Sequence, residues 1–125
     1  MFVSCAALWH SAQGASPATV GTWGGPHASL VVTDADARLE LDCATVVTDR
    51  RLTVDARGEF SSEASMALER GSLNNEAQRV GRRARLSGRV KGRAMTLDVT
   101  ALDPDEPVGH FEVELGKPAE LSKCK

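Results

Sequence analysis

The chain has 125 residues, enough for one domain with a single modest core, and its formal net charge is −2 at pH 7. A charge so close to neutral gives no overall field that would attract nucleic acid or an anionic membrane surface. Aromatic residues make up 4% of the chain and none is Tyr, which leaves little material for stacking on bases or sugars, so we expect no nucleic-acid partner.

Residues 1–19 are small, apolar or uncharged, and their apolar runs are too short to span a bilayer. Two interpretations stay open: a remnant of a secretory signal segment, or a flexible N-terminal tail. In the first, Ala12-Gln13-Gly14 is a cleavage site, or Cys5 lies in a degenerate lipidation box and provides a membrane tether. We expect export to the periplasm, the cell envelope or the extracellular space, with residues 20–125 forming one domain.

The first predicted hairpin joins residues 27–33 to residues 38–43 through a four-residue turn at 34–37. Apolar and polar residues alternate along both runs, a period typical of strands with one buried face. Pairing Thr33 with Arg38 sets Leu30 opposite Leu41 and Ala28 opposite Cys43 on the core side.

Further strands are predicted at residues 45–48, 52–54 and 59–68, followed by a polar, poorly ordered stretch at 69–81. A second hairpin joins residues 82–90 to residues 93–102 around Lys91-Gly92, where Gly is available for positive φ. It sets Leu86 opposite Leu97 and Arg85 opposite Asp98. The last strand, residues 108–115, turns Phe111 inward.

Seven or eight short strands joined by short turns, without a strong helix, predict an all-β fold. A small antiparallel up-and-down barrel is favoured over an open sheet because closure removes exposed edges. A β-sandwich is the alternative.

The triplet Gly21-Thr22-Trp23 resembles the Gly-x-Trp signature that opens the barrel in the calycin group, the lipocalins and avidins. The resemblance implies a calycin-like barrel with Trp23 plugging one end of the core; it does not imply biotin or retinoid binding. The layout as a whole, with Asp42-Cys43 at the end of the second strand and Cys124 near the end of the chain, is also similar to uncharacterised small exported proteins of bacteria.

Two of the three cysteines, Cys43 and Cys124, belong to the predicted domain. A disulfide between them would hold the C-terminal tail on the body and stabilise the fold by roughly 4 kcal/mol. It would also indicate an oxidising compartment. The alternative is a buried free Cys43 and an incidental thiol in the tail.

Cations cluster around the start of the second hairpin, at Arg82, Arg83, Arg85 and Arg89, and acids follow them in the next strands. This Arg-rich strand is either a surface that binds a charged protein partner or a solvated face with cross-strand ion pairs. Charge pairing on a wet face explains both runs without a partner.

No pair of ligands has zinc spacing, and neither a nucleophile motif nor a phosphate-binding glycine loop is present. We therefore expect no metal, no cofactor and no catalytic activity.

The favoured hypothesis is a non-catalytic binding module that takes a small apolar ligand inside the barrel. The predicted lining is Trp23, Met66, Leu86, Met95, Leu97, Val99 and Phe111. The alternative is a protein-binding module, an inhibitor or an envelope accessory protein, which acts through the Arg-rich strand and the loops. A third hypothesis is a purely structural domain.

Overall fold

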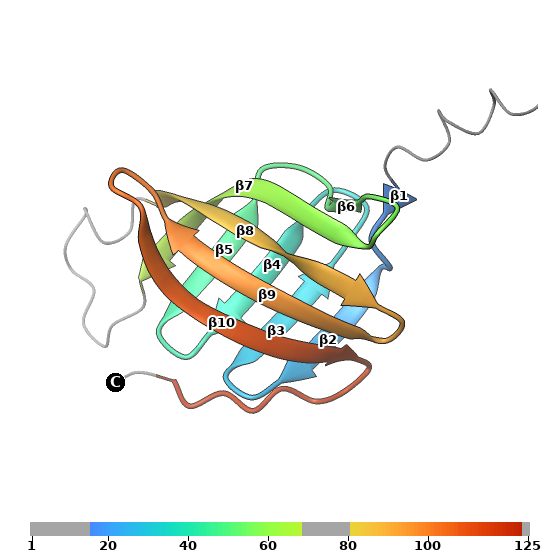
Figure 1. The fold of residues 1–125 in the computed structure, drawn as a ribbon. Coiled ribbons are helices and arrows are strands. Elements are labelled where there is room, and N and C mark those ends of the chain that lie inside the picture. Colours follow the sequence, from blue (N-terminus) through green and yellow to red (C-terminus); the bar gives the residue numbers. More distant parts are fainter. Residues whose placement is uncertain (1–15, 69–80, 124–125) are drawn as a thin grey trace, which may run out of the picture.

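The computed structural model describes residues 16–68 and 81–123, and all of their regular structure is β (Figure 1). Eight antiparallel strands close into a barrel in the order β10-β2-β3-β4-β5-β7-β8-β9. They are β2 (Gly21–Gly25), β3 (Ala28–Val32), β4 (Ala37–Leu41), β5 (Ala44–Thr48), β7 (Glu59–Leu68), β8 (Arg82–Lys91), β9 (Ala94–Ala101) and β10 (Glu106–Leu115). The predicted up-and-down antiparallel barrel is confirmed.

Two short strands lie outside the barrel. β1 (Ser16–Pro17) pairs with β6 (Thr53–Val54). β6 belongs to the segment that connects β5 to β7. The strand predicted at residues 52–54 therefore exists, but it takes no part in the barrel. The eighth barrel strand is instead Gly21–Gly25, which the sequence indicated only as the entry to the first strand.

The register of the first hairpin differs from the prediction by two residues. Leu30 lies opposite Leu39, and Leu41 lies opposite Ala28. The turn begins one residue earlier than predicted because Thr33 closes it: the Thr33 N–H donates to the Asp36 carbonyl (2.9 Å), and its Oγ1 accepts from the Asp36 N–H (3.2 Å). Cys43 consequently falls beyond β4 and is exposed, so its predicted place opposite Ala28 on the core side is wrong.

The second hairpin is also shifted by two residues. Lys91 pairs with Ala94, so the two-residue loop is Gly92-Arg93, with Gly92 at φ 64°. A glycine with positive φ in the first loop position suits a type II′ turn, whose twist matches that of the flanking strands. The predicted pairing of Leu86 with Leu97 is therefore replaced by Leu86 with Val99.

The core survives both shifts because a displacement of two residues leaves every side chain on the same face. Trp23, Leu30, Leu39, Leu86 and Leu97 are all fully buried. The leucines of the two hairpins thus meet in one dry interior, as the alternation of the sequence predicted.

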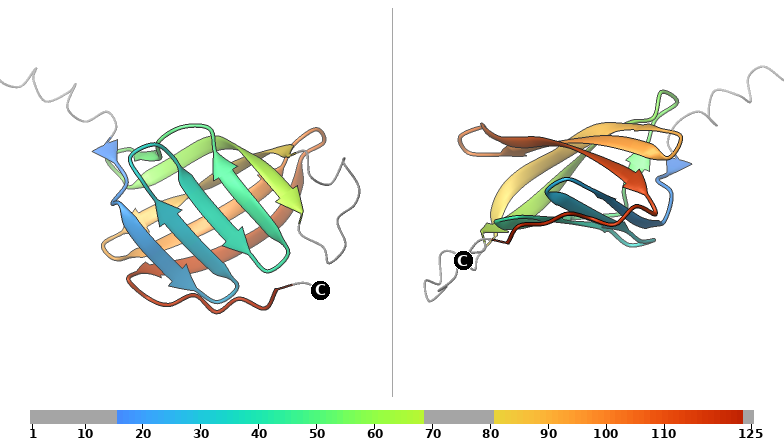
Figure 2. Two further views of the ribbon diagram at one scale, coloured as in Figure 1. Left: turned by 180° about the vertical axis from the view of Figure 1, so that it is seen from behind. Right: turned by 90° about the horizontal axis from the view of Figure 1, so that it is seen from below.

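The barrel closes through a narrow seam between β10 and β2. β10 pairs with β9 from Glu106 to Glu114, but it pairs with β2 only at Glu114 with Gly24 and Leu115 with Trp23. Beyond this seam β10 diverges from the β2–β5 side of the barrel (Figure 2, right). The divergence leaves room for a further segment along β2.

Residues 116–123, here named the C-terminal strap, occupy that room. The strap starts where the Gly116 N–H donates to the Thr22 carbonyl (2.8 Å) and continues along β2, where Glu120 bonds Gly25 (3.0 Å) and His27 (2.8 Å). It ends at the β4–β5 turn, where the Ser122 N–H donates to Asp42 (2.7 Å). In Figure 1 the strap follows the lower edge of the barrel.

Candidate functional site

A pocket of about 670 Å³ opens at the end of the barrel that carries the β2–β3 and β4–β5 turns. We name it the mouth pocket. Four parts of the chain meet there: the two turns with the strand ends beside them, the last residue of β7 and the middle of β10. Its lining comprises Pro26, His27, Leu41, Asp42, Cys43, Ala44, Leu68, Val108, His110, Phe111 and Glu112.

The body of the mouth pocket is apolar. Leu41 and Ala44 are buried and Phe111 is half-buried, whereas Leu68 and Val108 keep 40% and 39% of their surface exposed. Leu68 continues the inward-facing row of β7 past the point where the core ends. Within residues 16–68 and 81–123, the other exposed large hydrophobic side chains are Val20 and Val31, so two of four gather here.

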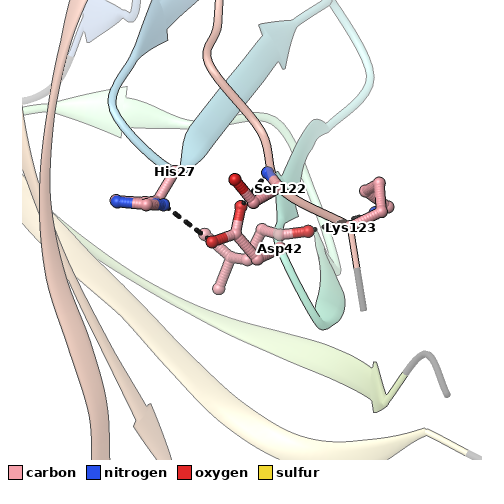
Figure 3. A network of polar contacts seen from close by, with 5 residues as sticks. His27, Asp42, Ser122 and Lys123 are labelled. Carbon is pink, nitrogen blue, oxygen red and sulfur yellow. Dashed lines mark hydrogen bonds and ion pairs between the residues drawn. The ribbon is translucent and has the colours of Figure 1, made fainter. Parts of the chain in front are cut away.

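One side of the rim is a network centred on Asp42 (Figure 3). Its Oδ2 lies 2.7 Å from Nδ1 of His27, and its Oδ1 accepts the Ser122 N–H at 2.7 Å. The Ser122 hydrogen bond, followed by the His27 contact, lowers the pKa of Asp42 below its ordinary value of 3.8. This network fixes the strap to the β4–β5 turn.

The turn between β2 and β3 positions the His27 side chain at the rim. Its φ of 65° follows Pro26, whose ring fixes φ near −65°, and this pair of signs is that of a type II turn. Gly or Asn is usual in the second central position of such a turn. The imidazole there reaches across to Asp42 instead.

The other side of the rim carries His110 and Glu112 on β10. The His110 Nδ1 lies 2.7 Å from Asp98 on β9, and its Nε2 lies 3.8 Å from Glu112. The Asp98 hydrogen bond and charge raise the pKa of His110 above its ordinary value of 6.5. Among the described residues, no three His, Cys, Asp or Glu side chains are placed to hold a metal ion.

Most of the predicted ligand-lining residues lie in the core rather than along the mouth pocket. Trp23, Met66, Leu86, Met95, Leu97 and Val99 are at most 5% exposed and pack against one another. Phe111 is the member of the set that lines the mouth pocket. Met95 also lines a second opening of about 480 Å³, between β10, the start of the strap and the β8–β9 turn.

Three side chains of the Arg-rich strand are held by partners on neighbouring elements: Arg82 by Glu106 (3.5 Å), Arg83 by Glu63 (3.1 Å) and Arg89 by the Arg57 carbonyl (3.3 Å). Arg85 lies exposed between Glu63 on β7 and Thr100 on β9. The predicted opposition of Arg85 and Asp98 is wrong, because the register shift places Asp98 opposite Ser87.

The predicted partner of Cys43 lies outside the described residues, as do Cys5 and the proposed cleavage site. The disulfide between Cys43 and Cys124 therefore stays a prediction. The strap does lead toward Cys43: the Lys123 ammonium donates to the carbonyl of Leu41, two positions before it (3.1 Å).

Comparison of the chain with protein-family models, with curated proteins and with solved structures returns no match. Across the part of the chain that the structure describes, no helix has the length and apolar character needed to cross a bilayer. The interpretation of the mouth pocket consequently rests on its own geometry.

Neither the mouth pocket nor the strap was predicted from the sequence. His27 and Asp42 belong to different turns, and the strap that joins them carries no alternation that would reveal a strand. One signal was available: Gly24-Gly25, where two adjacent residues without side chains permit close approach of another segment. A Cβ on Gly24 would lie 2.2 Å from the Lys117 carbonyl oxygen of the strap.

Proposed function

We propose that the protein is a non-catalytic binding module that takes a small apolar ligand at the mouth of its barrel. The observation that carries this proposal is the pairing of Leu68 and Val108, two exposed hydrophobic side chains, in the lining of one pocket. Exposed apolar side chains gathered around a concavity favour ligand binding, whereas single scattered ones need no explanation.

The volume of the mouth pocket supports the same proposal. Sites for small molecules are commonly concavities of about 300–1,000 Å³, with mostly apolar walls and a few polar groups that set the orientation of the ligand. At about 670 Å³, with polar groups confined to its rim, the mouth pocket fits that description. The tightly packed core favours this end of the barrel over its centre as the binding position.

Titration with the neutral apolar fluorophore N-phenyl-1-naphthylamine tests the proposal. We expect its emission to rise and shift to the blue on binding, and Leu68→Arg or Val108→Arg to weaken the binding about tenfold by placing a charge in the apolar wall. Both side chains are already partly exposed, so the variants should remain folded.

Val31→Arg is the matched control, because Val31 is as exposed as Val108, at 39%, and lies on β3 outside the mouth pocket. It should leave the affinity for the fluorophore unchanged. Absence of saturable binding, or an equal loss in all three variants, would show that the mouth pocket is not the ligand site.

The alternative role, protein binding through the Arg-rich strand, has weaker support because three of its four side chains already contact partners within the chain. A partner would have to compete with these contacts. A purely structural role does not explain why the exposed side chains of Leu68 and Val108 line the same pocket.

We also propose that the protein is exported and carries the disulfide between Cys43 and Cys124. The strap supports this, because Ser122 and Lys123 bond Asp42 and Leu41 and so direct the chain toward Cys43. Disulfides persist in oxidising compartments, so this bond would itself favour export. Mass measurement with and without reductant and alkylation decides whether the bond forms.

A further inference from the structure

We propose that the mouth pocket selects amphiphiles with an apolar body and a cationic head, such as a primary alkylamine. This inference rests on the proposed function and specifies its ligand class. The charges around the rim of the mouth pocket favour a cationic head.

The rim carries two carboxylates that belong to different elements. Asp42 follows β4, and Glu112 lies on β10. Asp42 is held ionised by the Ser122 N–H and by His27, and its lowered pKa keeps it charged through the neutral range. An apolar ligand that enters between these two elements therefore brings its polar end close to negative charge.

Glu112 is the group best able to meet a cationic head. Its side chain is 76% exposed, and its Oε2 lies 3.8 Å from Nε2 of His110, beyond hydrogen-bond distance. A carboxylate held so loosely is free to turn toward an incoming ammonium group at little cost. Asp42, by contrast, is already bonded through both oxygens and contributes through its field.

No Lys or Arg in the lining of the mouth pocket offsets these carboxylates. The nearby Lys123 ammonium is engaged by Glu40 (3.3 Å) and by the Leu41 carbonyl. His27 and His110 each turn one ring nitrogen to a carboxylate, Asp42 and Asp98 respectively. An amphiphile with a carboxylate head would thus meet repulsion at the rim, and a neutral alcohol neither attraction nor repulsion.

Displacement of bound N-phenyl-1-naphthylamine by dodecylamine, dodecanol and dodecanoate, at pH 8 and low salt, tests the inference. The three share one chain length, so head-group charge is the variable, and the amine is protonated at pH 8. We expect dodecylamine to displace the probe at roughly a tenth of the dodecanoate concentration, with dodecanol between them. Added salt should reduce the difference between the displacing concentrations of dodecylamine and dodecanoate, because it screens the charges.

Glu112→Gln isolates the head-group effect, because it removes the charge and keeps the shape. It should reduce the advantage of the amine over the alcohol about two- to fivefold, with the affinity for dodecanol unchanged. Glu114→Gln is the control: Glu114 lies two residues along the same strand and does not line the mouth pocket.

The inference is overturned if dodecanoate displaces the probe as well as dodecylamine does, or if Glu112→Gln and Glu114→Gln leave the same amine advantage. In either case the probe and dodecanol would still bind, and the proposed function would stand. If the probe itself does not bind, the proposed function and this inference fail together.

Discussion

At the scale of single residues, the absence of two side chains decides how the barrel closes. A Cβ on Gly24 would lie 2.2 Å from the Lys117 carbonyl oxygen, and one on Gly25 would lie 2.1 Å from the Glu112 carbonyl oxygen. Both obstacles are backbone atoms, which cannot move aside as the end of a flexible side chain can. Gly24 therefore admits the strap, and Gly25 admits β10.

Gly24→Ala should destabilise the protein by about 2–3 kcal/mol, because either the strap or β2 must shift to accept the methyl group. The free energy of unfolding, from urea denaturation followed by circular dichroism, measures the change. Gly92→Asn is the reference: nothing lies within 4 Å of a Cβ there, and Asn tolerates the positive φ of that turn. If Gly24→Ala lowers the free energy of unfolding no more than Gly92→Asn does, the close approach of the strap is contradicted.

At the scale of elements, the strap shows where inference from sequence stops. Its two ends are joined to Thr22 and to Asp42, and the Asp42 contact spans 80 residues of chain. Strand alternation reports which face of a segment is buried, but it does not report which distant turn a non-periodic segment reaches. The polar rim of the mouth pocket depends on such contacts, and for that reason it was not predictable.

Asp42→Ala should release the strap end, so that the Ser122 amide exchanges with solvent faster in the reduced protein. Asp42→Asn should have a smaller effect because the Asn oxygen can still accept the Ser122 N–H, although without charge. Asp34→Ala, in the exposed β3–β4 turn, should leave the Ser122 amide unchanged. Hydrogen exchange followed by NMR measures all three.

The hydrogen bond from the Ser122 N–H to Asp42 should depend on pH. Because the folded-state pKa of Asp42 is lowered, its stabilising contribution is present above pH about 4, the unfolded value, and is lost as the pH falls through the folded pKa. The Ser122 amide resonance of the natural protein should therefore titrate with a midpoint below 3.8, and that titration should vanish in Asp42→Asn. A midpoint above 3.8 would contradict the hydrogen bond.

At the scale of the whole molecule, the barrel and the inward faces of its strands were predictable because a period of two in the sequence is a direct record of burial. The registers were not, since a slip of two residues preserves every face and only turn geometry distinguishes the alternatives. Thr33 and Gly92 settle those turns. The mouth pocket was not predictable for a different reason: four separate parts of the chain form it, and no single stretch of sequence describes it.

The seam between β10 and β2 should be the least stable part of the barrel. It has two paired positions, whereas β7 and β8 pair continuously from Glu59 with Arg89 to Met66 with Arg82. Native-state hydrogen exchange at increasing denaturant should therefore show amides of residues 22–24 and 114–116 opening at lower free energy than those of β7 and β8. Equal opening energies throughout would mean that the seam unfolds only with the whole barrel.

The placement of β1 has a practical consequence for any work with this protein. β1 and its partner β6 lie at one end of the barrel, and the strap finishes at the other end, at the β4–β5 turn (Figure 1). A fluorescent reporter, purification handle or surface linker joined ahead of Ser16 would leave the ligand entrance facing away from the support. The same attachment made downstream of Lys123 would crowd the entrance, so immobilisation for binding measurements belongs on the N-terminal side.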